Sequence, residues 1–161
     1  MSFVVSGLPV EPFRPLFGLS DEALAERGVI RRTVDAEVGF PCRIRLEDAR
    51  PGETVLLLNY EHQPADTPYR ASHAIYVCEQ AREARRAVNE VPGALRVRKA
   101  ISLRAFDEAG MMLDADVAPG AQLEPAIERL LAIPGVAYVH AHNAGMGCYA
   151  ARIDRASDPL S

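Results

Sequence analysis

Long apolar runs are absent from this 161-residue sequence, and so is the cysteine pattern of a disulfide-bonded protein. No stretch of about 18 consecutive apolar residues occurs, so no membrane-spanning helix is expected. The three cysteines, Cys42, Cys78 and Cys148, are widely spaced, odd in number and never arranged as CxxC. Free thiols of this kind suit a reducing cytoplasm. The opening residues, MSFVVSGLPVEPF, lack the basic start and long apolar stretch of a secretory signal, so we expect a cytoplasmic protein with no membrane partner.

An excess of positive charge is also absent. The 18 lysines and arginines are outnumbered by 22 aspartates and glutamates, which gives a formal net charge of −4. A sequence-independent nucleic-acid binder needs unopposed cations to displace counterions from phosphate, so no nucleic-acid partner is expected. The motifs GxxxxGK[ST], strand–GxGxxG–helix and GxSxG are absent as well. Their absence disfavours nucleotide hydrolases, dinucleotide enzymes and α/β-hydrolases.

Helical patterns are few. The clearest helix covers residues 123–131, where apolar residues recur at i, i+3, i+4, i+7 and i+8 and form one stripe. A short helix is expected after Ser20, which is a suitable N-cap residue, and another over residues 79–92. The chain is long enough for one domain with a sizeable core. We therefore expect a single compact domain over residues 1–155, followed by a loose polar tail at residues 156–161.

Strand patterns are more numerous. The segment 42–46 alternates apolar residues with arginines, as a half-buried strand does, and the continuous apolar run 55–58 is typical of a central strand. Residues 101–117 are expected to form a hairpin. Strands and helices do not alternate, so the pattern predicts an α+β fold with a largely antiparallel sheet and two or three helices.

The closing hairpin, formed by residues 136–143 and 148–154, carries the most informative side chains. Because alternate residues of a strand share a face, His140 and His142 lie on one face and Asn143 on the other. Both faces of the first strand also carry apolar residues, which indicates a covered, central strand. Buried histidines need partners, because an unpaired buried polar group costs about 1–3 kcal/mol.

Three interpretations of this hairpin compete, and the first is a metal site. An H-x-H pair on a strand places two imidazoles where one ion can bridge them. A catalytic zinc site typically has three protein ligands and one open position, so a third ligand must come from elsewhere. The candidates for it are His62, Glu61, Cys42 and Cys148.

The second interpretation is nucleophilic catalysis by Cys148. Gly145 and Gly147 permit a tight turn whose N–H groups can stabilise an oxyanion, while a histidine deprotonates the thiol and Asn143 orients that histidine or the substrate. Pairing of His142 with Cys148 would place both side chains on one face, whereas pairing of Asn143 with Cys148 would turn the thiol away. The third interpretation is structural: histidines bonded to main-chain carbonyls beside a buried thiol.

A polar connection at residues 59–73 is the second informative stretch. About fifteen residues is long for a connection, and such loops are often functional. Arg70 has the planar guanidinium needed to clamp a carboxylate or phosphate with two parallel hydrogen bonds. The alternative is an Ω-like surface loop held by its own contacts.

Four blocks of the sequence together resemble a known family. They are PCRIRLEDARPGETVLLLNYEHQPADTPYRAS, SLRAF, DADV and AYVHAHNAGMGCYAARI, in this order within residues 40–155. The set resembles a bacterial family catalogued as domain of unknown function 1203. The resemblance implies a single-domain bacterial protein of similar length, and it carries over no activity, cofactor or catalytic residue.

We expect a small enzyme that acts on a small polar or anionic molecule where the 59–70 loop meets the 140–148 hairpin. The alternative is a non-catalytic ligand-binding or protein-interaction module with a structural hairpin. No metal or cofactor is assigned, and a homodimer through an exposed sheet edge is a further expectation. The expected catalytic residues are Cys148, His142, His140 and Asn143, and the expected ligand-binding residues are Arg70, Tyr69, Tyr60, His62, Gly145 and Gly147.

Overall fold

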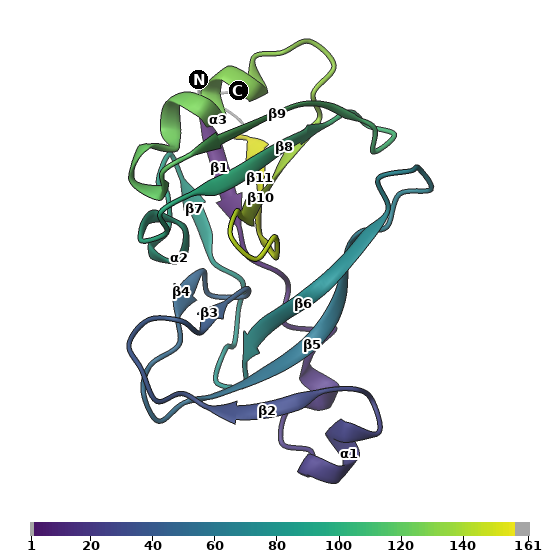
Figure 1. Cartoon of the computed structure of the whole chain (residues 1–161), viewed down its shortest axis with the longest axis vertical. Coiled ribbons are helices and arrows are strands. Elements are labelled where there is room, and N and C mark those ends of the chain that lie inside the picture. The colour runs from purple at the N-terminus through teal and green to yellow at the C-terminus, as the bar shows by residue number, and fades with distance from the viewer. Residues whose placement is uncertain (1, 157–161) are drawn as a thin grey trace.

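The computed structural model describes residues 2–156, which form two β-sheets and three short α-helices (Figure 1). The six-stranded sheet contains, in spatial order, β7 (Arg86–Val88), β1 (Phe3–Ser6), β11 (Tyr149–Arg155), β10 (Tyr138–Asn143), β8 (Ile101–Phe106) and β9 (Met112–Ala118). The five-stranded sheet contains β2 (Ile30–Thr33), β5 (Thr54–Gln63), β6 (Ala71–Cys78), β3 (Pro41–Cys42) and β4 (Glu47–Asp48). The α-helices are α1 (Asp21–Ala25), α2 (Gly93–Arg96) and α3 (Glu124–Leu131), and 3-10 turns lie at Arg14–Leu16 and Gly120–Gln122.

Strand pairing is antiparallel except between β3 and β6. The predicted α+β class, with largely antiparallel pairing in one compact domain, is confirmed, although the strands divide into two sheets. Within residues 2–156, no helix combines the length and apolar composition needed to cross a bilayer. Of the expected tail, Ala156 donates its N–H to the Ser2 carbonyl at 3.0 Å, and the remainder lies outside the described residues.

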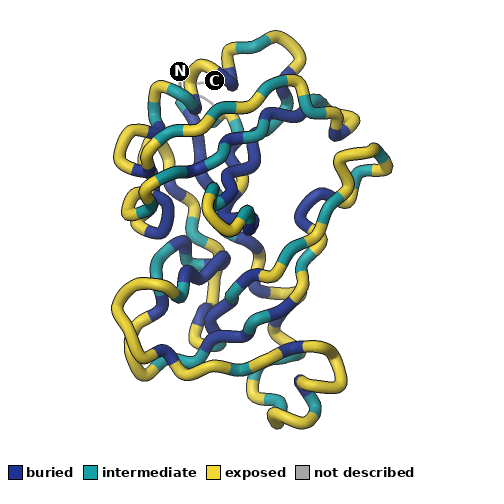
Figure 2. Tube along the Cα trace, in the orientation of Figure 1, coloured by how far each residue is buried: buried dark blue, intermediate teal, exposed yellow. Residues whose placement is uncertain are grey.

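Helix α3 covers one face of the six-stranded sheet. Its apolar stripe, Ile127, Leu130 and Leu131, is fully buried in the same core cluster as Val139 and Ala141 of β10 (Figure 2). The sequence-based prediction of this helix is confirmed. Since Val139 and Ala141 point toward this core, the alternate side chains of β10 must point to the opposite face, toward the five-stranded sheet.

The predicted loop at residues 59–73 is wrong, because most of it belongs to a long hairpin. Strand β5 runs on to Gln63 and β6 begins at Ala71, and these two residues pair across an irregular register. This β5–β6 arm extends toward the β8–β9 turn (Figure 1). Its tip is attached there, since Thr67 Oγ1 donates to the Gly110 carbonyl at 3.2 Å. Pairing between β5 and β6 satisfies the main-chain N–H and C=O groups of these polar residues. A polar composition is therefore compatible with a strand, and it did not by itself distinguish a strand from a loop.

Two further predictions of secondary structure are wrong, because contacts with distant parts of the chain determine these segments. Of the expected strand at 42–46, Cys42 lies in β3, but residues 43–46 form the tight turn from β3 to β4, in which Arg43 is buried and Leu46 has a φ of 58°. The expected helix at 79–92 contains strand β7, because Ala87 and Val88 pair with Val5 and Val4 of β1. Pairing with an existing sheet therefore overrides the helical propensity of this segment.

Gly7 occupies a position where the backbone leaves β1 and passes the 42–46 turn. A Cβ atom at Gly7 would lie 2.1 Å from the Ile44 carbonyl oxygen, which is backbone and cannot swing aside. We expect Gly7→Ala to lower the free energy of unfolding by about 1–3 kcal/mol, as overpacking does. Urea unfolding followed by circular dichroism measures it. Gly93→Ala is the matched control, since its Cβ meets nothing within 4 Å, and equal stability of both variants would contradict the prediction.

Candidate metal-binding site

Strand β10 places two histidines on the face opposite α3. Across β8, His140 pairs with Arg104 and His142 with Ser102. Across β11, His142 pairs with Tyr149, because a bulge shifts the register between Ala141 and His142. Residues that pair directly across strands point to the same face, so these side chains form one polar patch that faces the β5–β6 arm.

The third histidine, His62, comes from the β5–β6 arm. Its ring centroid lies 4.8 Å from that of His142 and 6.3 Å from that of His140. One ring nitrogen from each of the three residues lies within 4.8 Å of the other two, and all three residues are buried. The next residue, Gln63, fastens the arm by donating from Nε2 to the Tyr138 hydroxyl at 2.9 Å.

Tyr149 packs against the whole histidine cluster. Its ring is stacked on His62 at 5.6 Å and meets His140 and His142 edge-on at 5.2 and 5.8 Å. Behind it lies Tyr60, whose ring centroid is 6.0 Å from that of Tyr149. Burial raises the pKa of the Tyr149 phenol, so this residue is a neutral aromatic support for the three imidazoles.

Each ring of the cluster has a buried nitrogen without a hydrogen-bond partner among the described residues. His142 Nδ1 lies 2.9 Å from the Gly147 carbonyl oxygen. A carbonyl only accepts, so Nδ1 carries the proton and Nε2 keeps its lone pair. Among residues 2–156, the buried side-chain atoms without a hydrogen-bond partner are His62 Nδ1, His140 Nδ1, His142 Nε2 and, next to the hairpin turn, Asn143 Oδ1. Each such atom costs about 1–3 kcal/mol when nothing binds it.

All three imidazoles are neutral near pH 7. Burial, followed by neighbouring positive charge, lowers the pKa of His140 to about 3. Burial is also the main reason that the pKa of His142 falls to about 3 and that the pKa of His62 is lowered. Neutral imidazole is the form that coordinates metal ions, so the cluster needs no deprotonation before it can bind one.

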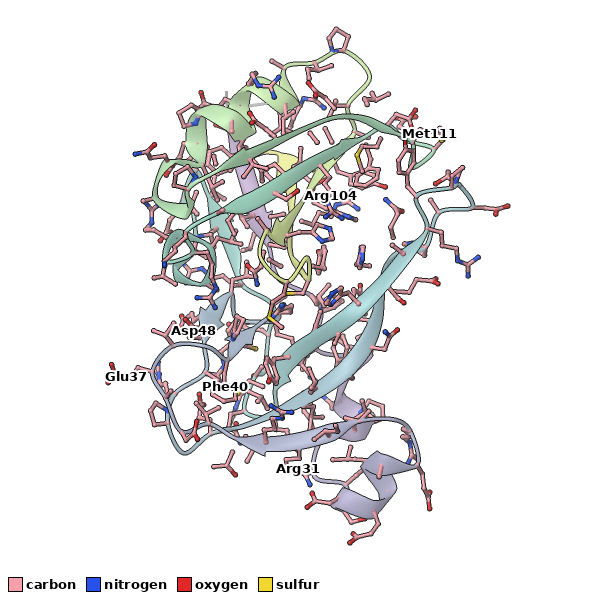
Figure 3. All side chains as sticks on the ribbon, viewed as in Figure 1. Arg31, Glu37, Phe40, Asp48, Arg104 and Met111 are labelled. Atoms are coloured by element: carbon pink, nitrogen blue, oxygen red, sulfur yellow. The ribbon has the colours of Figure 1, made fainter. Side chains whose placement is uncertain are left out.

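Positive charge flanks the cluster on both sides of His140. Arg104 of β8 and Arg152 of β11 are its direct cross-strand neighbours. Figure 3 shows Arg104 on the face of β8 that is turned toward the β5–β6 arm. Arg152 is neutralised by Asp154 at 3.0 Å and lies over the Tyr138 ring at 4.3 Å. Arg104 therefore supplies the unneutralised charge beside the histidines.

Cys148 lies in a different environment from the histidines. Of the two registers open from the sequence, the structure has Asn143 opposite Cys148: the Asn143 N–H donates to the Cys148 carbonyl at 2.9 Å. Asn143 Nδ2 also donates to Cys148 Sγ at 3.3 Å. Within the described residues, no hydrogen bond joins this thiol to a histidine. The bulge at Ala150 of β11 is the reason, since it places Tyr149 opposite His142.

The remaining expected ligand-binding residues are spread over the arm and the hairpin turn. Tyr69 is exposed and contacts Phe106 edge-on at 6.3 Å. Arg70 forms an exposed ion pair with Glu61 at 3.1 Å. Gly147 adopts a φ of 84° and supplies the carbonyl that fixes His142, whereas Gly145 is exposed in the turn. The structure therefore brings His62, His140 and His142 together and leaves Arg70 outside this cluster.

Sequence reasoning missed three residues of this region: Arg104, Tyr149 and Arg43. The alternation of Ser102, Arg104 and Phe106 on β8 was the available signal for Arg104, but its meaning depends on the β8–β10 register. No local signal identified Arg43, because an arginine in an alternating segment normally faces solvent.

Comparison with known proteins assigns the chain to a sequence family. The family model described as "Protein of unknown function (DUF1203)" matches residues 39–155, which include all three histidines. No curated protein and no solved structure matches the chain. The family match covers well over half of the sequence and confirms the resemblance seen in its four blocks. The chain belongs to the DUF1203 family.

Proposed function

We propose that this protein binds a divalent transition-metal ion of the zinc class through His62, His140 and His142, and that the ion acts on a small polar or anionic molecule. The observation that carries the proposal is the convergence of three buried, neutral imidazoles, each with a ring nitrogen that has no hydrogen-bond partner. A single ion can bind one ring nitrogen from each of the three residues. Three unpaired polar atoms would otherwise be an expensive arrangement to bury.

The donor set supports this class of ion. Imidazole nitrogen suits zinc, copper, nickel and iron, whereas magnesium and calcium prefer oxygen. In a tetrahedral site with bonds of about 2.0–2.1 Å, ligand nitrogens lie about 3.4 Å apart. The nitrogens here lie within 4.8 Å of one another, so modest side-chain rotation closes the site. The Gly147 carbonyl supports binding by holding the His142 ring and its tautomer in place.

Three protein ligands favour a catalytic rather than a purely structural ion. Structural zinc sites usually have four protein ligands, whereas catalytic sites keep a position open for water or substrate. When bound, such an ion lowers the pKa of its water to about 7 and polarises carbonyl oxygens. Tyr149 and the buried flanks of β10 restrict solvent around the histidines. The alternative, a non-catalytic binding module, predicts that the same ion binds but has no coordination position at which water or substrate can exchange.

The cytoplasmic location and the homodimer expected from the sequence remain predictions. A reducing cytoplasm is proposed because Cys42, Cys78 and Cys148 are all free and buried. A homodimer through a sheet edge is proposed at β9, which is the last strand of the six-stranded sheet and exposes Leu113 and Val117.

Metal binding is the direct test of the proposed function. Apo protein titrated with Zn²⁺ or Co²⁺ is expected to bind about one equivalent, and the cobalt form should show visible absorption from a nitrogen-ligated ion. His142→Ala is expected to weaken binding by about 100-fold or more, because it removes one of three ligands. Competition with a chromophoric chelator measures these affinities.

His73→Ala is the matched control, since His73 is the remaining histidine of the chain and stands outside the cluster. It should bind Zn²⁺ within about threefold of the unaltered protein, as expected for a residue that is no ligand. Less than about 0.1 equivalents of ion in the unaltered protein, or equal affinity in His142→Ala, would contradict the proposal.

A further inference from the structure

We infer that Arg104 and the ion held by the three histidines form one binding site for an oxyanion, so that the substrate is a small molecule with a carboxylate or phosphate group. This inference rests on the proposed function, because the ion is the second anchor. Its own support comes from the position of Arg104, its lack of a counter-charge and the charge of the whole cluster.

The position of Arg104 is set by strand pairing. It lies directly opposite His140 across β8 and β10, and Ser102, two residues earlier, lies opposite His142. Both arginine and histidines therefore face the β5–β6 arm, as Figure 3 shows for Arg104. Arg104 and Ser102 are thus direct cross-strand neighbours of two of the three histidines.

Arg104 has no acidic partner among residues 2–156, although it is half-buried. Its one hydrogen bond is long, 3.4 Å from Nε to Ser102 Oγ. Burial lowers its pKa, which reflects the loss of solvent around the guanidinium. Arg152 offers a direct comparison, because it flanks His140 on the other side and is neutralised by Asp154. A guanidinium that is partly desolvated and lacks a carboxylate is ready to bind an anion from solution.

Charge balance determines the class of ligand. Three neutral imidazoles add no charge, so a divalent ion together with Arg104 creates a strongly positive centre. Within residues 2–156, the Asp154 carboxylate on β11 is paired with Arg152, and the Glu61 carboxylate, next to His62, is paired with Arg70. An oxyanion can place one oxygen on the open metal position and others on the fork of N–H donors of Arg104. A neutral ligand would leave the positive charge uncompensated.

Oxyanion titrations of the cobalt-loaded protein test this inference. Acetate and inorganic phosphate are added separately, and changes in the visible cobalt spectrum report binding at the open position. Arg104→Gln is expected to weaken binding of the preferred oxyanion by about 10-fold or more, because it removes a charge-assisted pair of hydrogen bonds. Comparison of the two titrations distinguishes a carboxylate ligand from a phosphate ligand.

The controls separate this inference from the proposed metal site. Arg104→Gln should keep its Co²⁺ affinity within about threefold and bind neutral imidazole as the unaltered protein does, because neither needs the guanidinium. Arg152→Gln should change oxyanion binding by less than about threefold, since Asp154 already neutralises that arginine. If Arg104→Gln does not fold, Arg104→Lys replaces it, and it too should bind oxyanions more weakly, because it lacks the planar fork.

Two results would overturn the inference, and they differ in what else they affect. Failure of the unaltered protein to bind Co²⁺ would remove the proposed function and the shared site with it. Normal Co²⁺ binding with equal oxyanion affinities for the unaltered protein and Arg104→Gln would overturn the oxyanion site alone and leave the metal site standing.

Discussion

The metal-free protein is expected to be about 4 kcal/mol less stable at pH 5 than at pH 7, because two buried histidines cannot accept protons in the folded state. Burial lowers the pKa of His140 and of His142 to about 3. In the unfolded chain both titrate near a pKa of about 6.5. Their contribution to stability is therefore complete above pH 6.5 and is lost progressively as the pH falls toward 3. At pH 5 each contributes a loss of about 2 kcal/mol.

The surroundings of these imidazoles reinforce that direction. The titratable groups that act on them are His62 from β5, His73 from β6, Arg104 from β8, and Arg152 and Tyr149 from β11. These groups are cationic or neutral, and the Asp154 carboxylate is bound by Arg152. Only the Gly147 carbonyl favours protonated His142. Nothing in this set supplies the negative charge that an imidazolium would need.

Urea unfolding of chelator-treated protein at pH 7, 6 and 5 measures this dependence. The double variant His140→Gln/His142→Gln should lose less than about 1 kcal/mol over the same range, because its two amides do not titrate. His73→Ala should retain the full dependence, since that histidine is not buried in the cluster. A flat profile for the unaltered protein would show that the histidines are protonated in the folded state.

Arg43→Met is expected to lower the free energy of unfolding by about 3 kcal/mol, because two buried carbonyl groups lose their donor. Arg43 is only 3% exposed. Its Nε donates to the Tyr149 carbonyl and its Nη1 to the Pro41 carbonyl, both at 2.8 Å. Tyr149 belongs to the six-stranded sheet and Pro41 to the five-stranded sheet, so one side chain joins the two. Methionine keeps an apolar stem of similar length and removes only the donors.

The matched control is Arg32→Met, on the exposed strand β2, whose guanidinium has only a long contact of 3.4 Å with the Tyr76 hydroxyl. That change should alter stability by less than about 0.5 kcal/mol, as is usual for surface positions. Urea unfolding midpoints of the two variants provide the comparison. A loss below about 1 kcal/mol for Arg43→Met would mean that water or other donors replace the guanidinium, and that Arg43 does not join the sheets.

The local sequence pattern was sufficient to predict those elements whose structure is determined by residues that are neighbours along the chain. The stripe of α3, the Ser20 cap of α1 and the hairpins β8–β9 and β10–β11 were predictable, because 3.6-residue and two-residue periods reflect the geometry of a single element. The same two-residue period placed His140 and His142 on one face. His62 was one of four candidates for the third metal ligand. A local sequence pattern could not select among them, because it does not show which segment packs against the hairpin.

Tertiary packing decided the rest of the site. His62 reaches the other histidines only because the polar segment around it forms the β5–β6 arm and docks on the six-stranded sheet. Arg43 is buried only because two sheets close over its turn. The bulge at Ala150 of β11 places Tyr149 opposite His142 and turned Cys148 away from the histidines.

The sequence by itself therefore determined the class of fold, most of its elements and the position of His140 and His142 on one face of a strand, since these follow from periodicity and residue chemistry. Only the tertiary structure decided which residues complete the cluster and which charge lies beside it. The physical reason is that strand register and sheet docking are set by contacts between segments far apart in the chain, and both registers of the closing hairpin were open to its glycine-rich turn.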